Sequence, residues 1–219
     1  MNRSFETLLF DMDGLMLDTE RLSCAATYRA AEATGIAVDE ALLHGMIGLS
    51  EARCTAYLAE RLGSAERAAT LQRASRQTYR QMLENEDIAL KPGIVELLEW
   101  AEERGIPRAV ATSTRREIAD LKLSRSGLGR FFEHTVAGDE VERTKPAPDL
   151  YLAAAARLQA APQRAIVLED SMVGMRAGLA AGARVLLIPD LIAPSAEEAE
   201  QALAVCRDLR QALALLREL

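Results

Sequence analysis

The feature that most constrains this chain is the alternation, after residue 93, of short apolar runs with segments of helical periodicity. Apolar runs predict strands at 7–10, 106–111, 134–138, 165–168 and 184–188. Helical periodicity predicts helices at 94–104, 116–126, 148–158 and 173–181, with one or two more in the tail. Strands that alternate with helices form a parallel sheet covered by helices on both faces. We therefore predict a doubly wound α/β fold.

The stretch between the first strand and the rest has a different pattern. From Thr19 to about Leu83, Ala, Leu, Arg and Glu recur at helical spacing, and the strand signals disappear. We predict about four helices here, inserted into the sheet-forming chain and packed over the sheet. The predicted domains are 1–17 with 90–219 as the core, and 18–89 as the helical insertion. Hinges are expected near 17–19 and 90–93.

Composition excludes several classes of function. The 219 residues carry a net charge of −7, with Lys and Arg scattered and only 4% aromatic residues, so nucleic acid is not an expected partner. With two histidines, a histidine metal site or a Ser-His-Asp triad is not expected. The three cysteines have no metal-binding spacing, which favours reduced thiols. No apolar stretch indicates a signal peptide or a membrane span, so we expect a cytoplasmic protein. We also expect it to be a monomer or a weak dimer.

Polar side chains follow three of the predicted strands, and a lysine lies in a loop before a predicted helix. These residues are Asp11, Asp13, Thr112, Ser113, Lys145, Glu169 and Asp170. Ligands of open parallel sheets bind beyond the carboxyl ends of the strands. We therefore expect these side chains, which are separated by up to about 160 residues of chain, to converge at one edge of the sheet.

The types of residue in this set indicate phosphoryl chemistry. Crowded carboxylates repel one another, and Mg²⁺, which prefers oxygen ligands, relieves that repulsion. Asp11 and Asp170 can supply these ligands, while Lys145 and Thr112 can hold the oxygens of a phosphoryl group. The Asp11-x-Asp13 spacing lets one carboxylate attack phosphorus while the other exchanges a proton with the leaving oxygen.

Four segments carry a resemblance to a known family. They are LLFDMDGLMLDTE, AVATSTR, TKPAPD and VLEDSMVGMRAGLAAG, and they span residues 8–182 in this order. Together they resemble the haloacid-dehalogenase-like hydrolases, and most of all the phosphatases with a helical cap after the first motif. The resemblance implies a Rossmann-like core with an inserted helical cap domain, and a small phosphate ester as substrate.

The resemblance also implies a role for each matched residue. It implies Thr112 and Lys145 as the phosphoryl-binding pair, and Asp11, Asp13, Asp170 and Glu169 as the magnesium site. Asp11 is then the nucleophile, and Asp13 is the general acid and base that also binds Mg²⁺ through its backbone carbonyl. Glu169 either supports the metal or orients Lys145. Relatives often have Gly where Thr144 precedes the lysine, which is a minor departure.

Two reactions within the family remain open. The motifs look like those of phosphatases acting on sugar or nucleotide-like monophosphates, including pseudouridine-5′-phosphatase. Sugar phosphate mutases of the β-phosphoglucomutase type usually carry Arg where this chain has Glu51, and His where it has Ser23. Both departures favour a phosphatase. Candidate substrate contacts are Ser113, Gly48, Arg53 and Arg115, in addition to Thr112 and Lys145.

An alternative of another class is a phosphate-accepting signalling receiver domain. Such a domain also places acids, a hydroxyl residue and a lysine at the edge of a doubly wound sheet. It is much shorter than this chain and lacks a helical insertion, and its acids at the first strand are adjacent. The Asp-x-Asp spacing and the length therefore count against it.

Overall fold

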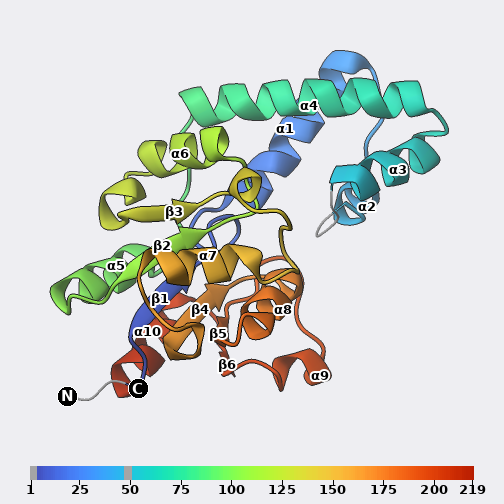
Figure 1. Cartoon of the computed structure of the whole chain (residues 1–219). Helices are drawn as coiled ribbons and strands as arrows, with labels where there is room; N and C mark the ends of the chain where they lie inside the picture. Colours follow the sequence, from blue (N-terminus) through green and yellow to red (C-terminus); the bar gives the residue numbers. More distant parts are fainter. Residues whose placement is uncertain (1–3, 47–50) are drawn as a thin grey trace. The chain divides into compact units, whose positions relative to one another are not determined.

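Among the residues that the structure describes, 4–46 and 51–219, six strands form one sheet in the order β3-β2-β1-β4-β5-β6 (Figure 1). The strands of this computed structural model are β1 (Thr7–Phe10), β2 (Arg108–Ala111), β3 (His134–Val136), β4 (Ala165–Glu169), β5 (Arg184–Leu187) and β6 (Ala204–Val205). Every neighbouring pair is parallel. The doubly wound α/β prediction is therefore confirmed.

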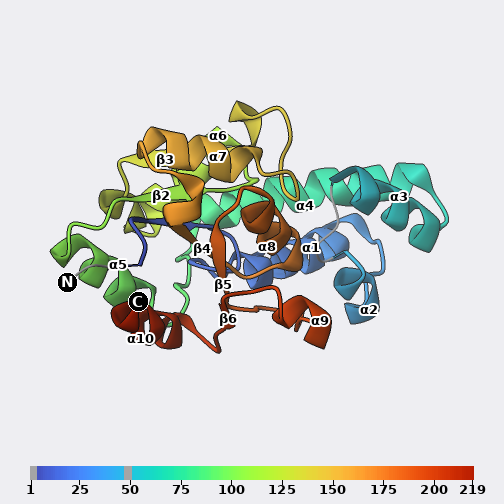
Figure 2. The same cartoon turned by 60° about the horizontal axis from the view of Figure 1, so that its bottom comes forward.

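Helices cover both faces of the sheet. They are α5 (Ile94–Glu103), α6 (Arg116–Arg125), α7 (Asp149–Arg157), α8 (Met172–Ala180), α9 (Ala196–Ala199) and α10 (Leu209–Glu218), with 3₁₀ turns η1 (Leu128–Phe131), η2 (Gly138–Glu140) and η3 (Pro162–Arg164). On one face, Leu9 and Val167 of the strands share a core with Tyr151 of α7 and Met175 of α8. Strand residues of the opposite parity, such as Leu8, are also fully buried. Helices α5 and α10 pack against each other (Figure 2).

The observed strands differ from the predicted ones at their ends. Strand β2 begins at Arg108 rather than at residue 106, because Pro107 has no N–H to donate to a ladder. Strand β4 extends by one residue to include Glu169. Strand β6 was not predicted, since two residues carry no periodicity, and it pairs with β5 at the edge of the sheet.

The chain divides into two compact units, Met1–Asp18 with Ala89–Leu219, and Thr19–Ile88. The second unit consists of α1 (Thr19–Thr34), α2 (Glu40–His44), α3 (Glu51–Leu62) and α4 (Ala65–Asn85). Its own apolar core includes Ala30, Leu43, Leu58 and Leu71. Helix α4 begins at a serine cap, where the Ser64 hydroxyl accepts from the Arg67 N–H at 3.3 Å. Within the described part of the chain, no helix is both long and apolar enough to cross a lipid bilayer.

The two segments that connect these units lie side by side in the first unit. Leu17 and Leu90 form an antiparallel bridge. The Asp18 N–H donates to the Ala89 carbonyl at 2.9 Å, and the Lys91 N–H donates to the Met16 carbonyl at 2.9 Å. The Lys91 ammonium lies 2.6 Å from Asp190 Oδ1 and 3.4 Å from Asp18 Oδ1. These contacts fix both connecting segments to the core.

Candidate active site

Three carboxylates meet where β1 and β4 end. Asp11 follows the last residue of β1, Glu169 is the last residue of β4, and Asp170 comes next. These strands are neighbours in register, with Phe10 opposite Leu168, so their carboxyl ends coincide. Each acid offers an oxygen within 4.8 Å of the other two. The predicted convergence of residues about 160 positions apart is thus present for this set.

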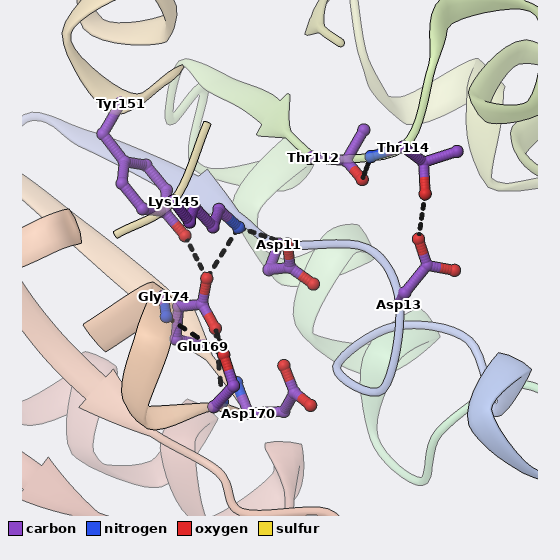
Figure 3. Close-up of polar contacts among 10 residues, drawn as sticks. Asp11, Asp13, Thr112, Thr114, Lys145, Tyr151, Glu169, Asp170 and Gly174 are labelled. Carbon is purple, nitrogen blue, oxygen red and sulfur yellow. Dashed lines mark hydrogen bonds and ion pairs between the residues drawn. The ribbon is translucent and has the colours of Figure 1, made fainter. Parts of the chain in front are cut away.

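The Lys145 ammonium lies between two of these acids. Its Nζ donates to Asp11 Oδ1 and, at 2.6 Å, to Glu169 Oε1 (Figure 3). The Lys145 side chain is only 6% exposed. A lysine buried to this degree needs carboxylate partners, because burial of an unpaired ammonium is costly. The contacts therefore hold the lysine amine against the Asp11 carboxylate.

Both oxygens of Glu169 are used by protein donors. Oε1 accepts from Lys145 and from the Tyr151 hydroxyl at 2.6 Å. Oε2 accepts from the Asp170 N–H at 3.2 Å, and from the Ser171 N–H and hydroxyl at 3.3 and 3.1 Å. A carboxylate offers about four lone-pair sites, so little acceptor capacity is left for a metal. This geometry favours Glu169 as the residue that orients Lys145.

The Asp170 carboxylate lies against a glycine. A Cβ added at Gly14 would be 2.3 Å from Asp170 Oδ2, and Gly14 has φ +82°, a conformation that L side chains rarely adopt. No described residue forms an ion pair with Asp170 or donates a side-chain hydrogen bond to its carboxylate. Among the described residues, the Asp170 carboxylate is thus close to Asp11 but has no positive partner of its own.

Burial and crowding shift the protonation of this cluster. Burial raises the pKa of Asp11 from 3.8 to about 7, against the lowering effect of the Lys145 charge, while Glu169 adds a smaller upward shift. Burial also raises the pKa of Asp170 well above 3.8, with the charges of Glu169 and Asp11 acting in the same direction. For Lys145, burial lowers the pKa, but the two acids outweigh it and raise that pKa above 10.5.

This donor set fits a hard divalent cation. Asp11 and Asp170 lose their solvation on burial. Together with Glu169 they are three neighbouring acids with one nearby ammonium group, that of Lys145. A cation between Asp11 and Asp170 would therefore offset their repulsion. Oxygen ligands of this kind suit Mg²⁺.

Asp13 and Thr112 occupy the neighbouring side of the site (Figure 3). Thr114, in the loop after β2, contacts both residues. Its hydroxyl donates to Asp13 Oδ2 at 2.7 Å, and its N–H donates to Thr112 Oγ1 at 3.0 Å. The Lys122 ammonium of α6 lies 2.5 Å from Asp13 Oδ1. The Thr112 side chain is buried, and its hydroxyl is held in place by this turn.

The other predicted substrate contacts that the structure describes are exposed, unlike the buried cluster. Ser113 is exposed in the loop after β2. Arg115 is 82% exposed, with its Nε 3.6 Å from Asp139 Oδ2. Arg53 is exposed on α3 of the second unit. Gly48 lies outside the described residues.

Three residues with contacts in the site were not identified from the sequence. Tyr151 lies two residues after the start of α7, and nothing in the local sequence distinguishes it from an aromatic residue of the core. Thr114 belongs to the Thr112-Ser113-Thr114 run, and a third hydroxyl residue directly after the strand was the one sequence feature that could have indicated its place in the site. Lys122 lies in a polar helical segment, where a lysine is normally solvated, and nothing in the local sequence marks it as buried.

Comparison with known proteins places the chain in a family. A family model described as haloacid dehalogenase-like hydrolase matches residues 8–188. A phosphorylated carbohydrates phosphatase of Thermotoga maritima is 33% identical over 177 residues, covering 81% of this chain and 82% of that protein. A Drosophila melanogaster protein assigned as a pseudouridine-5′-phosphatase is 33% identical over 213 residues, covering 92% and 90%. A crystal structure of a T. maritima protein assigned as a beta-phosphoglucomutase superposes with a TM-score of 0.83 at 30% identity, covering 98% and 99%. This chain belongs to the haloacid dehalogenase-like hydrolases.

Proposed function

We propose that this protein is a Mg²⁺-dependent phosphatase that forms a phospho-aspartate on Asp11. The observation that carries the proposal is the Lys145 ammonium, buried between Asp11 and Glu169. Beside it lies the Asp170 carboxylate, which has no cationic partner of its own among the described residues. Phosphoryl transfer depends on positive charge placed around the phosphoryl oxygens and on a fixed nucleophile. The cluster offers both within one buried site.

The proposed reaction has two steps. In the first, an Asp11 oxygen forms a bond to phosphorus as the ester P–O bond breaks, and Asp13 gives its proton to the leaving oxygen. In the second, the Asp13 carboxylate takes a proton from water, whose oxygen bonds phosphorus as the Asp11–phosphorus bond breaks. Inorganic phosphate leaves. Throughout, Lys145 and the Thr112 hydroxyl hold the phosphoryl oxygens. Asp11 and Asp170 would hold Mg²⁺, which would offset the charge of the phosphoryl group.

The substrate class follows from the relatives. One is named as a phosphatase of phosphorylated carbohydrates, and another is assigned to pseudouridine-5′-phosphate. We propose small sugar or nucleotide-like monophosphates, with the helical unit Thr19–Ile88 as a cap domain that supplies specificity. Ser113, Gly48, Arg53 and Arg115 remain proposed substrate contacts, in addition to Thr112 and Lys145. The receiver-domain alternative has no support from the family match.

A sugar phosphate mutase is the second candidate, because a structure that superposes over 98% of this chain is assigned as a beta-phosphoglucomutase. The two reactions differ in where the phosphoryl group ends. A phosphatase passes it to water, whereas a mutase returns it to another hydroxyl of the sugar. Inorganic phosphate as the main product supports the phosphatase, and isomerised sugar phosphate as the main product supports the mutase.

The test is a panel of sugar and nucleotide monophosphates, assayed for inorganic phosphate with Mg²⁺ and with EDTA. We expect turnover of at least one ester with Mg²⁺, loss of that turnover in EDTA, and recovery when Mg²⁺ is restored. Asp11→Asn should abolish turnover without unfolding the chain. Asp120→Asn makes the same chemical change at an exposed carboxylate of α6 and should keep full activity. Turnover retained by Asp11→Asn would refute the nucleophile assignment.

A further inference from the structure

A second buried lysine contacts the candidate acid and base of the site. Lys122 lies on α6, where the other charged residues are exposed or partly exposed, and its own side chain is 4% exposed. Its ammonium lies 2.5 Å from Asp13 Oδ1, and the two residues are separated by 109 positions in the chain. Lysines are almost never buried to this extent unless they are paired. The position of this ammonium is therefore tied to the Asp13 carboxylate.

Each of the two oxygens of Asp13 has its own donor. Lys122 donates to Oδ1 and the Thr114 hydroxyl donates to Oδ2 at 2.7 Å. Donors on both oxygens restrict rotation about both side-chain torsions of the aspartate, so the carboxylate has one preferred orientation. The Thr114 N–H also holds Thr112 Oγ1 (Figure 3). One turn after β2 thus orients a phosphoryl-binding hydroxyl and the neighbouring acid together.

We propose that Lys122 is a positioning residue for proton transfer by Asp13, with Thr114 as the second arm of the same support. The inference rests on the proposed phosphatase function. Lys122 does not touch substrate in this role. It holds the Asp13 carboxyl group where the proton reaches the leaving oxygen. A misplacement of about 1 Å can cost an enzyme about 100-fold in rate, so the effect is measurable.

Leaving-group dependence separates this role from plain stabilisation of the fold. The two esters are p-nitrophenyl phosphate, whose phenolate departs without a proton, and benzyl phosphate, whose alkoxide requires one, on a ring of similar size. Because kcat/KM includes only the steps up to formation of the phospho-aspartate, it isolates the acid role of Asp13. Lys122→Met should lower kcat/KM for benzyl phosphate by about 10- to 100-fold and for p-nitrophenyl phosphate by less than about 3-fold.

Lys91→Met is the matched control. Lys91 is also a mostly buried, ion-paired lysine of the first unit, with its side chain 14% exposed, but its partners are Asp190 and Asp18. The Lys91→Met substitution should leave the ratio of the kcat/KM values for the two esters unchanged. Thr114→Val should change that ratio in the same direction as Lys122→Met, by about 3- to 10-fold.

Several outcomes would overturn the inference. If Lys122→Met and Thr114→Val lower kcat/KM of both esters by the same factor, the contacts only stabilise the fold. If Lys122→Met does not fold, Thr114→Val decides alone, because it only replaces the hydroxyl of a partly exposed residue with a methyl group. A wild-type protein that hydrolyses neither these two esters nor any ester of the monophosphate panel would refute the proposed phosphatase instead, so the two failures are distinguishable.

Discussion

Replacement of Glu169 by Gln tests how the buried cluster is held together. The substitution keeps the shape of the side chain but replaces one acceptor oxygen with a donating NH₂ group. Oε1 faces Lys145 and Tyr151, and Oε2 faces the Asp170 N–H and two donors of Ser171. In either orientation of the amide, the NH₂ group points at donors. The Tyr151 and Ser171 hydroxyls can turn to accept from this group, but the Lys145 ammonium and the backbone N–H groups cannot. At least one hydrogen bond is therefore lost, together with the negative charge of the acceptor.

The expected fall in the free energy of unfolding follows from two opposing effects. Removal of one partner of a buried ion pair costs about 3–5 kcal/mol, and Glu169 is fully buried. The loss is partly offset, because the Glu169 charge also raises the pKa of Asp11 and Asp170 and so repels them. We expect the free energy of unfolding to fall by about 2–4 kcal/mol. For a chain of this length, Tm should fall by about 5–15 °C.

The assay is urea unfolding in EDTA, followed by tryptophan fluorescence. Trp100, the one tryptophan in the sequence, is buried on α5 of the first unit, so its signal reports the unit that contains Glu169. The control Glu103→Gln makes the same chemical change at an exposed position of α5, the helix that carries Trp100. It should alter the free energy of unfolding by less than about 0.5 kcal/mol. A loss below about 1 kcal/mol for Glu169→Gln would refute the argument that the charge of Glu169 holds Lys145.

Three further outcomes are expected. Folding raises the pKa of Asp11 from 3.8 to about 7, so between these pH values the native state binds a proton that the unfolded state has lost. The free energy of unfolding therefore falls as the pH rises from about 4 to 7. Because Mg²⁺ requires the carboxylate, it should raise Tm more at pH 8 than at pH 5.5, and equal increases would contradict this. Gly14→Ala should weaken Mg²⁺ binding measured by calorimetry, because the added Cβ meets Asp170. Gly105→Ala, at φ +57° but in open space, should not affect that binding. Lys91→Met should cost about 2–4 kcal/mol in urea unfolding, and a cost near zero would mean that its contact with Asp190 is well solvated.

The sequence predicts the fold and the central cluster for a common reason. Strands buried on both faces read as apolar runs, and parallel strands end at one edge, so Asp11 and Asp170 can be placed together without any coordinates. The role of Glu169 remained open between metal support and orientation of Lys145. That choice depends on which donors surround its oxygens, and these come from α7 and the start of α8 as well as from the lysine.

Contacts that depend on a tertiary partner could not be predicted from the sequence. Lys122 belongs to a polar helical segment, and its burial depends on a partner more than a hundred residues earlier. Strand β6 has two residues, too few to show alternation, and it forms only because β5 offers an unpaired edge. In each case a tertiary partner decides the structure, and local periodicity does not contain that information.

The bridge between Leu17 and Leu90 has a consequence for how such a chain can be re-engineered and can diversify. The residues that enter and leave the helical segment are hydrogen-bonded to each other. The two ends of the segment are therefore held together in the core, as the two ends of a hairpin turn are held by the strands beside it. The entropy of closing a loop grows only slowly with its length. Seventy residues can thus be exchanged, shortened or replaced at this point while the register of the sheet is preserved. One core could in this way carry inserts of very different size.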